Sequence, residues 1–269
     1  MTGKRVYRHG IGARVAHWGW VLAMLVLVMS GLQIFNAAPY LDASDKSDPS
    51  RRILAFGAHL QNGVPVGTTT IFGKTFTTTH LFGYTSDGLG GESPRAFPAA
   101  VTLPGPQDLA DGRRWHLLFA WALTAAFILY VAAAALRGTL RELVLRPSDL
   151  PKLWPMQAYY LRLRREPPPH GTYNPLQKAA YTIVLFVLFP LVIVTGLTLS
   201  PGVDAAIPWL TAAFGGRQFA RTWHFVFMGI LIAYLAGHLV LVTTTGVWNN
   251  LRSMTTGWYT LGEHDGVGP

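Results

Sequence analysis

The sequence predicts an all-α integral membrane protein built as a bundle of four transmembrane helices. Half of the 269 residues are hydrophobic and only 13% are charged, whereas a soluble domain usually has about a quarter charged residues. The chain also contains four apolar runs of about twenty residues, the length that crosses the hydrocarbon core of a bilayer. In lipid the backbone must satisfy its own hydrogen bonds, so each run is expected to be a helix.

The expected helices cover roughly residues 15–35, 116–136, 179–199 and 222–244, within a single domain of residues 1–269. Basic residues precede the first run, as they do in a secretory signal peptide. However, the run is longer than the usual signal core of about 7–15 residues, and no clear A-x-A cleavage site follows it. We therefore expect the first helix to be retained.

The distribution of the +9 net charge indicates membrane topology rather than nucleic-acid binding. The tail before the first run has four basic residues and no acid, and residues 137–178 have eight Lys/Arg against three acids. Residues 36–113 are nearly balanced. Because basic loops stay on the cytoplasmic side, we expect both termini and the 137–178 loop in the cytoplasm and the 36–113 loop outside. The protein is expected to be a multi-pass protein of a bacterial inner membrane.

The two long loops differ in composition. The outer loop, 36–113, is rich in Gly, Thr, Pro and Asp, and its segment TTTIFGKTFTTT (68–79) predicts a small hairpin around a Gly-Lys turn. This loop either forms a partner surface or is a disordered spacer. The inner loop, 137–178, contains LRLRREPPPHG, a basic run followed by prolines. It is expected to be a connector that faces lipid headgroups.

Histidines occur inside the apolar runs, where a polar side chain is costly and indicates function. His224 and His238 are fourteen residues apart, which places them about 21 Å apart along one helix and on nearly the same face. His116 and His224 both end an R-x-W-H motif, one turn or less inside their helices. His17 and His238 lie near the inner ends of theirs. These depths predict two bis-histidine pairs, an outer His116/His224 pair and an inner His17/His238 pair.

A planar cofactor with two axial positions fits each pair. The chain has no cysteine, which excludes disulfides, cysteine-ligated iron–sulfur clusters and the C-x-x-C-H attachment of c-type haem. The prediction is therefore two non-covalent haem b groups, whose iron is bound by His17, His116, His224 and His238. A haem-free transporter, whose histidines carry protons or metal ions, is the alternative from another class.

Other residues repeat around the outer pair. The first and third runs end in similar text, VMSGLQIF (28–35) and IVTGLTLS (193–200). Gly31 and Gly196 share the depth of the outer pair and would allow haem to approach the helix backbone, although helix packing alone also explains glycine there.

Three arginines are candidates for pairing with haem propionates, and interfacial anchoring explains them equally well: Arg114 and Arg221 at the outer pair, and Arg14 at the inner one. The remaining histidines lie in tails or loops and are expected at the surface, with the first two as a candidate metal or docking pair: His59, His80, His9, His170 and His264.

The sequence resembles the membrane cytochrome b subunits of formate dehydrogenase, thiosulfate reductase and nickel–iron hydrogenase, a di-haem family. The resemblance covers all four helices, and its haem ligands match His17 in RVAHW, His116 in RRWH, and the pair His224 and His238. YNPLQK (173–178) is similar to the family's Y-N-x-x-Q-K opening of helix three. In the formate dehydrogenase type, that asparagine lies at a cytoplasmic quinone pocket beside the inner haem.

By this resemblance, Asn174 and Gln177 are quinone-site residues, whereas the residues alone also allow them simply to begin helix three. The outer loop is much longer than in the formate dehydrogenase type, and no fifth helix is expected as in the hydrogenase subunits. The chain most resembles relatives that work with an extracytoplasmic molybdopterin oxidoreductase.

We therefore expect an electron-transfer subunit of an oxidoreductase complex, which passes electrons between an extracytoplasmic redox partner and the membrane quinone pool. The alternative within the same chemistry is a self-contained quinone-linked oxidoreductase that acts on a small diffusible molecule.

Overall fold

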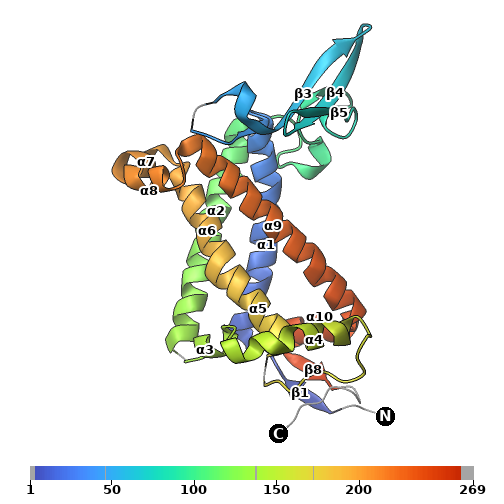
Figure 1. The fold of residues 1–269 in the computed structure, drawn as a ribbon, viewed down its shortest axis with the longest axis vertical. Coiled ribbons are helices and arrows are strands. Elements are labelled where there is room, and N and C mark those ends of the chain that lie inside the picture. The colour runs from blue at the N-terminus through green and yellow to red at the C-terminus, as the bar shows by residue number, and fades with distance from the viewer. Residues whose placement is uncertain (1–3, 46, 137, 172, 262–269) are drawn as a thin grey trace. The chain divides into compact units, whose positions relative to one another are not determined.

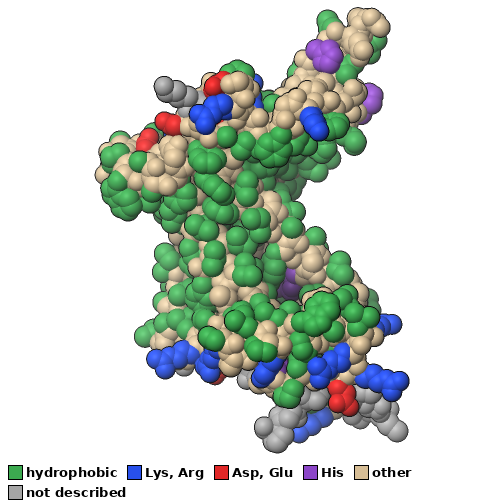
Figure 2. Space-filling view, in the orientation of Figure 1, with side chains coloured by type: hydrophobic (Ala, Val, Ile, Leu, Met, Phe, Trp, Pro, Cys, Tyr) green, Lys and Arg blue, Asp and Glu red, His purple; other side chains and the backbone are tan. Residues whose placement is uncertain are grey.

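The computed structural model describes residues 4–45, 47–136, 138–171 and 173–261. Four of its helices are long and apolar enough to cross a membrane: α1 (Ile11–Asn36), α2 (Leu109–Leu136), the continuous helix Pro175–Thr198, and α9 (Arg217–Thr244) (Figure 1). At most 28% of the apolar window of each helix is buried, so most of these side chains face outward (Figure 2). The four predicted helices are confirmed.

Each long helix begins before the apolar run that predicts it. Polar residues such as Asp111 and Arg217 continue the helix beyond the segment of hydrocarbon length that hydropathy detects. One expectation is corrected by this: His116 is predicted within one turn of its helix start, but it is the eighth residue of α2, about two turns in. His224 is likewise the eighth residue of α9, so the matched depth of the two histidines holds.

The third long helix contains an irregular turn. It consists of α5 (Pro175–Ile183), one π-helical turn, η4 (Val184–Leu188), and α6 (Phe189–Thr198). Pro190 has no N–H to donate into the helix, and its ring would clash with the carbonyl group four residues earlier in a regular α-helix. A wider turn just before the proline accommodates it.

The described chain divides into two compact units, and each long helix contributes one segment to each of them. The first unit comprises residues 4–18, 126–191 and 230–261. The second unit comprises residues 19–125 and 192–229.

Two short strands near the ends of the described chain pair with each other in the first unit. β1 (Arg5–Tyr7) pairs antiparallel with β8 (Trp258–Thr260), and α10 (Val247–Thr256) immediately precedes β8. This strand pair fits an even number of membrane crossings, which would bring both termini to the same side. The cytoplasmic orientation of the termini stays a prediction.

The 137–178 loop also belongs to the first unit. It forms α3 (Leu140–Leu143), η3 (Pro147–Lys152) and α4 (Leu153–Tyr160), all of which pack against α5. Lys178 on α5 donates to the Asp149 carboxylate at 3.1 Å. The backbone N–H of Arg146 also donates to this carboxylate and, with Lys178, lowers the pKa of Asp149. Lys and Arg side chains gather over this part of the first unit (Figure 2).

Residues 36–113 are folded in the second unit, which corrects the all-α prediction. β2 (Tyr40–Asp42), β3 (Arg52–Gln61), β4 (Val64–Ile71) and β5 (Lys74–Thr77) form an antiparallel sheet in that order. β6 (Gly83–Ser86) pairs with β7 (Glu92–Arg95). The disordered-spacer alternative is therefore wrong for the described part of this loop. Short helical turns complete the unit: η1 (Pro49–Arg51), η2 (Ala99–Val101), α7 (Pro201–Ala206) and α8 (Pro208–Ala213).

The predicted hairpin in TTTIFGKTFTTT is confirmed as β4–β5. Its turn residues are Phe72 and Gly73, one position earlier than the expected Gly-Lys turn. Both have positive φ, at 46° and 78°, and Asn62 and Gly63 between β3 and β4 are similar at 52° and 78°. These values are typical of two-residue hairpin turns.

An aromatic cluster packs the sheet against the helix ends. The Phe35 ring, near the end of α1, is 4.8 Å from the Phe225 ring on α9 and 6.0 Å from the Phe56 ring on β3. Burial of each such side chain stabilises the fold by about 1.5–3 kcal/mol. Phe225 directly follows His224, so this cluster also restricts the position of that histidine. The cluster consists of Phe35, Leu41, Leu54, Phe56, Ala96, Phe97 and Phe225.

Arg95 ties the same loop to α1 through hydrogen bonds. Arg95 is only 3% exposed, and this burial lowers the pKa of its guanidinium group. Nε donates to the Phe97 carbonyl at 2.8 Å, and Nη2 donates to Thr102 Oγ1 at 3.0 Å and to Gln33 Oε1 on α1 at 3.4 Å. The loop is therefore a folded part of the second unit rather than a spacer.

Candidate functional site

The structure brings His116 and His224 together in the second unit. Their rings extend from α2 and α9, with ring centres 6.2 Å apart and ring planes at 71°. The two helices place them at equal depth because each histidine is the eighth residue of its helix. The predicted pairing of His116 with His224 is thus present in the geometry.

Two hydroxyl groups, which the sequence analysis missed, contact this pair. Ser30 Oγ on α1 lies 3.1 Å from His116 Nδ1, and Thr195 Oγ1 on α6 lies 3.1 Å from His224 Nδ1. Both residues are 0% exposed. The available signal was the repeated text itself, because Ser30 and Thr195 directly precede Gly31 and Gly196 in the two similar segments.

The two glycines lie against the same two imidazole rings. A Cβ at Gly31 would stand 3.3 Å from His116 Cε1, and a Cβ at Gly196 would stand 3.1 Å from His224 Cε1. The space that the missing side chains leave is thus taken by the histidines. This explains both glycines without a direct contact to haem, which was the predicted reason for them and stays a prediction.

His17 and His238 form the second pair, within the first unit. Their ring centres are 6.4 Å apart and their planes are at 56°. The Tyr234 ring stacks on His238 at 6.1 Å, and the Trp18 ring meets His17 edge-on at 5.2 Å. His17 Nδ1 is buried and has no hydrogen-bond partner, so this pair lacks the hydroxyl contact seen at His116.

Both ring separations fit two imidazoles bound to one metal ion. A metal–imidazole bond is about 2.0–2.1 Å long, and the ring centre lies about 1.2 Å beyond the nitrogen, so ligands on opposite sides have centres about 6.4 Å apart. Within the described residues, no group of three or more His, Cys, Asp and Glu could hold a metal ion. A bis-histidine metal site would therefore need a cofactor that supplies the remaining ligands, as haem does.

The three candidate arginines are engaged within the protein. Arg114 donates to Asp111 Oδ1 at 2.7 Å, and its side chain is 80% exposed. Arg221 donates to the Ala38 carbonyl and stands over the rings of Phe35 and Tyr40, at 5.3 Å from each. Neither contact tests the predicted propionate pairing, which stays a prediction.

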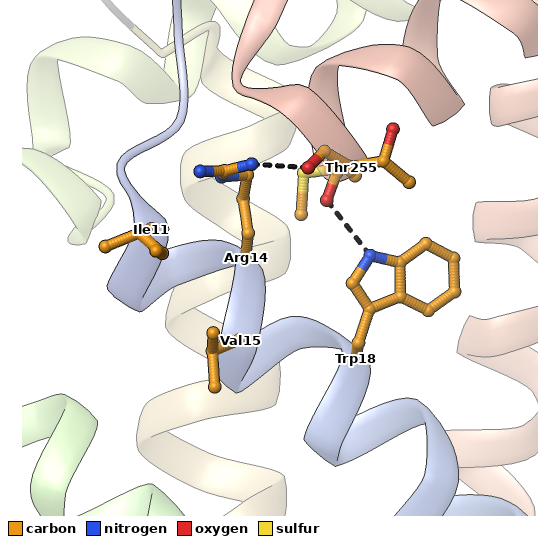
Figure 3. A pocket seen from close by; sticks show the side chains of 6 residues that line it. Ile11, Arg14, Val15, Trp18 and Thr255 are labelled. Atoms are coloured by element: carbon orange, nitrogen blue, oxygen red, sulfur yellow. Dashed lines mark hydrogen bonds between the residues drawn. The ribbon is translucent and has the colours of Figure 1, made fainter.

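Arg14 joins α1 to α10 in the first unit. Figure 3 shows Arg14 and Trp18 on α1 reaching the end of α10, where Arg14 donates to the Thr255 carbonyl and Trp18 Nε1 donates to the Met254 carbonyl at 3.0 Å. These donors satisfy carbonyl groups that a helix end leaves unpaired. A shallow hollow of about 430 Å³ lies there, lined by Ile11, Arg14, Val15, Trp18, Met254 and Thr255.

Asn174 and Gln177 form the N-terminal cap of α5. Asn174 Oδ1 accepts from the Gln177 backbone N–H at 2.9 Å, and Gln177 Oε1 accepts from the Asn174 backbone N–H at 3.0 Å. This capping box is the helix-start role that the residues alone allowed. Asn174 Nδ2 also donates to the Tyr160 hydroxyl at 3.1 Å, and burial raises the pKa of Tyr160. Tyr160 is a polar neighbour that the sequence analysis missed.

The histidines in the loops do not join either pair. His59 is on β3 and exposed, and His80 Nδ1 is 2.7 Å from Glu92 Oε1. The candidate metal or docking pair of His59 and His80 stays a prediction. His264 lies outside the described residues.

Two comparisons with known proteins show what the chain is similar to. A family model described as prokaryotic cytochrome b561 matches residues 8–257, a range that includes all four paired histidines. The chain is also similar to a putative protein-methionine-sulfoxide reductase subunit, YedZ1, of Azospira oryzae. The two are 24% identical over 249 residues, which cover 89% of this chain and 92% of the relative.

Substitution of Gly196 by alanine tests the contact between the glycine and the histidine. A Cβ only 3.1 Å from His224 Cε1 must displace the ring by a few tenths of an ångström, and overpacking of this kind costs about 1–3 kcal/mol. We expect Gly196→Ala to lower haem retention in purified protein severalfold, and Gly31→Ala to have the smaller effect. Gly229→Ala on α9, where nothing lies within 4 Å, is the matched control. Equal retention in Gly196→Ala and Gly229→Ala would contradict the contact.

Proposed function

The chain belongs to the prokaryotic cytochrome b561 family, and from this premise we propose that it is a di-haem cytochrome b that links an extracytoplasmic redox partner to the membrane quinone pool. Membership of the family makes the chain a membrane haem b protein that transfers electrons. The number of haems, their ligands, the quinone and the partner are parts of the proposal.

The observation that carries the di-haem proposal is the presence of two separate histidine pairs with almost the same spacing. Ring centres 6.2 Å and 6.4 Å apart both match the value of about 6.4 Å expected for two imidazoles that bind one metal ion. His116 and His224 would hold one haem and His17 and His238 the other. With no cysteine in the chain, both haems would be held without covalent attachment. Bound haem supplies a one-electron couple.

The side chains around the pairs have roles in holding these groups. Each pair of imidazoles is presented by two different helices, α2 and α9 for His116 and His224, and α1 and α9 for His17 and His238. Gly31 and Gly196 leave room for the His116 and His224 rings. Arg14, Arg114 and Arg221 are the proposed partners for propionates.

Two observations support a redox partner. The relative from Azospira oryzae is named as a subunit of a putative protein-methionine-sulfoxide reductase, and a subunit implies a second chain. Residues 36–113 form a folded sheet with exposed apolar side chains, including Leu60 at 71% and Phe72 at 77% exposure. We propose that this sheet meets the partner, a molybdopterin oxidoreductase, on the non-cytoplasmic side, and that the partner exchanges electrons with the His116–His224 haem, whose proposed ligands belong to the same unit as the sheet.

The quinone site is proposed at the start of α5. Asn174 and Tyr160 are hydrogen-bonded to each other and belong to the same unit as the His17–His238 pair. Beyond its hydrogen bonds to Tyr160 and Gln177, the Asn174 amide keeps one N–H and one lone pair by count, and Tyr160 can donate its hydroxyl proton. A quinone carbonyl or quinol hydroxyl could use these groups.

The assignment of ligands predicts how haem is lost from variants. His116→Ala and His224→Ala should each remove the same haem and leave much of the other, and His17→Ala and His238→Ala should each remove the second. His59→Ala is the control, because His59 is exposed on β3. Haem content and reduced-minus-oxidised spectra of the purified variants measure this. If His116→Ala removed the signal that His17→Ala also removes, the pairing would be wrong.

Topology is a second prediction, because charge asymmetry places residues 137–178 inside and residues 36–113 outside. The natural chain has no cysteine, so single cysteines can be labelled without background. Both Ser86 and Ser148 are exposed. In intact cells, an impermeant thiol reagent should label Ser86→Cys but not Ser148→Cys. The reverse pattern would move the partner surface to the cytoplasm and the quinone site to the opposite face.

The role of Asn174 in quinone binding can be separated from its role as a cap. Asn174→Ser keeps a good N-cap residue but loses the amide, whereas Asn174→Ala loses both, and loss of the cap costs about 0.5–2 kcal/mol. A lost hydrogen bond to quinone costs about 0.5–1.5 kcal/mol. We therefore expect Asn174→Ser to slow quinone-linked turnover roughly two- to tenfold and to weaken quinone-analogue inhibition, with both haems still bound and still reduced by the partner.

The converse variant changes the proposed partner surface. Phe72→Asn keeps a residue type that tolerates the positive φ of the β4–β5 turn and removes an exposed ring. It should impair electron exchange with the partner while quinol still reduces the haems.

Normal quinone kinetics in Asn174→Ser, together with a less stable Asn174→Ala, would leave Asn174 as a cap alone.

A further inference from the structure

The hydroxyl groups of Ser30 and Thr195 make matching contacts on opposite sides of one histidine pair. Ser30 Oγ donates to the Val26 carbonyl at 2.6 Å and lies 3.1 Å from His116 Nδ1. Thr195 Oγ1 donates to the Val192 carbonyl at 3.2 Å and lies 3.1 Å from His224 Nδ1. A carbonyl can only accept, so in these two backbone hydrogen bonds the hydroxyl is the donor.

This donor assignment favours one tautomer of both rings. With each hydroxyl proton donated to a carbonyl, the hydroxyl oxygen can accept from the imidazole, and in that arrangement Nδ1 carries the ring proton. Nε2 of the neutral ring then keeps its lone pair, which is the form that binds a metal ion. With both hydroxyl residues 0% exposed, water has no access to replace them.

On α1 and on α6, the residue after the hydroxyl-bearing residue is a glycine that lies against the same imidazole ring. Ser30-Gly31 and Thr195-Gly196 are consecutive pairs, in which the first residue contacts Nδ1 and the second lies under Cε1 of the same ring. One residue thus sets the tautomer and the next allows the close approach. At the other pair, His17 Nδ1 is buried without a partner, so His17 lacks this hydrogen bond.

We propose that Ser30 and Thr195 are positioning residues for the His116–His224 haem, which fix the tautomer of both ligands and lower the reduction potential of that haem alone. This inference rests on the proposed ligand assignment. A hydrogen bond from Nδ1–H makes an imidazole a more basic ligand, and a more strongly donating ligand favours oxidised iron. Loss of either hydroxyl should therefore make this haem easier to reduce.

Redox titration of Thr195→Val and Ser30→Ala tests the proposal. Valine has nearly the shape of threonine without the hydroxyl. Each variant should raise the equilibrium constant for reduction of one haem two- to tenfold, where tenfold is about 59 mV for one electron. The second haem should keep its wild-type potential and serves as the internal reference. Thr195→Ser, which keeps a hydroxyl, should restore the wild-type potential.

Thr124→Val is the matched structural control. Thr124 Oγ1 on α2 donates to the Ala120 carbonyl at 2.7 Å, the same bond within the helix that Ser30 makes to Val26. This variant loses that bond and should leave both potentials unchanged. A second measurement, the low-spin ferric spectrum of the haem, should change in Thr195→Val and Ser30→Ala but not in Thr124→Val.

The outcomes separate this proposal from the proposed function. Unchanged potentials in both Thr195→Val and Ser30→Ala, or equal shifts of both haems, would overturn the positioning role and leave the ligand assignment standing. A shift confined to the haem that His17→Ala removes would also overturn it. If the wild-type protein titrated as a single haem, the di-haem proposal itself would fail.

Discussion

The distance between paired imidazole rings is the constraint on which the rest of the structure depends. Rings 6.2 Å and 6.4 Å apart can be presented only if helices from different parts of the sequence meet in a defined register. α2 and α9 achieve this with histidines at the eighth position of each helix. The neighbouring helices then place small or hydroxyl-bearing residues opposite the rings, because a larger side chain would displace them.

The second unit repeats the same arrangement of residues around each histidine of the His116–His224 pair. Its two halves use the same parts: an R-x-W-H motif on one helix and a hydroxyl–glycine pair on the helix that faces it. Phe225, next to His224, is packed into the aromatic cluster with Phe35, and Arg95 fastens the folded loop to Gln33 on α1. The loop thereby stabilises the ends of the helices that carry the site. The His17–His238 pair has different surroundings, with an unpartnered Nδ1 on His17 and a tyrosine stacked on His238.

Sequence patterns predicted the helices and the histidine pairs because both depend on simple geometry. A span of about twenty apolar residues has one regular structure available in lipid, and matched depths determine which histidines can face each other. The strands were harder to predict. The distal half of β3 is exposed on both faces, so it has no alternation of polar and apolar residues to indicate a strand.

Ser30 and Thr195 were missed because a hydroxyl in a membrane helix usually bonds to its own backbone, and only the three-dimensional contact reveals the histidine. The sequence allows two roles for Asn174 for a similar reason. A capping box can be recognised from residue types three positions apart, whereas no spacing of residues indicates a bound quinone.

The haem content of the purified wild-type protein tests the central claim most directly. A pyridine haemochrome measurement on detergent-purified protein, normalised to polypeptide by amino-acid analysis, gives the number of b-type haems per chain. Two haem-binding histidine pairs predict two haems per chain after the protein is supplied with excess haem. A value of one would mean that only one pair is a ligand pair, and a value of zero would contradict the haem assignment of both.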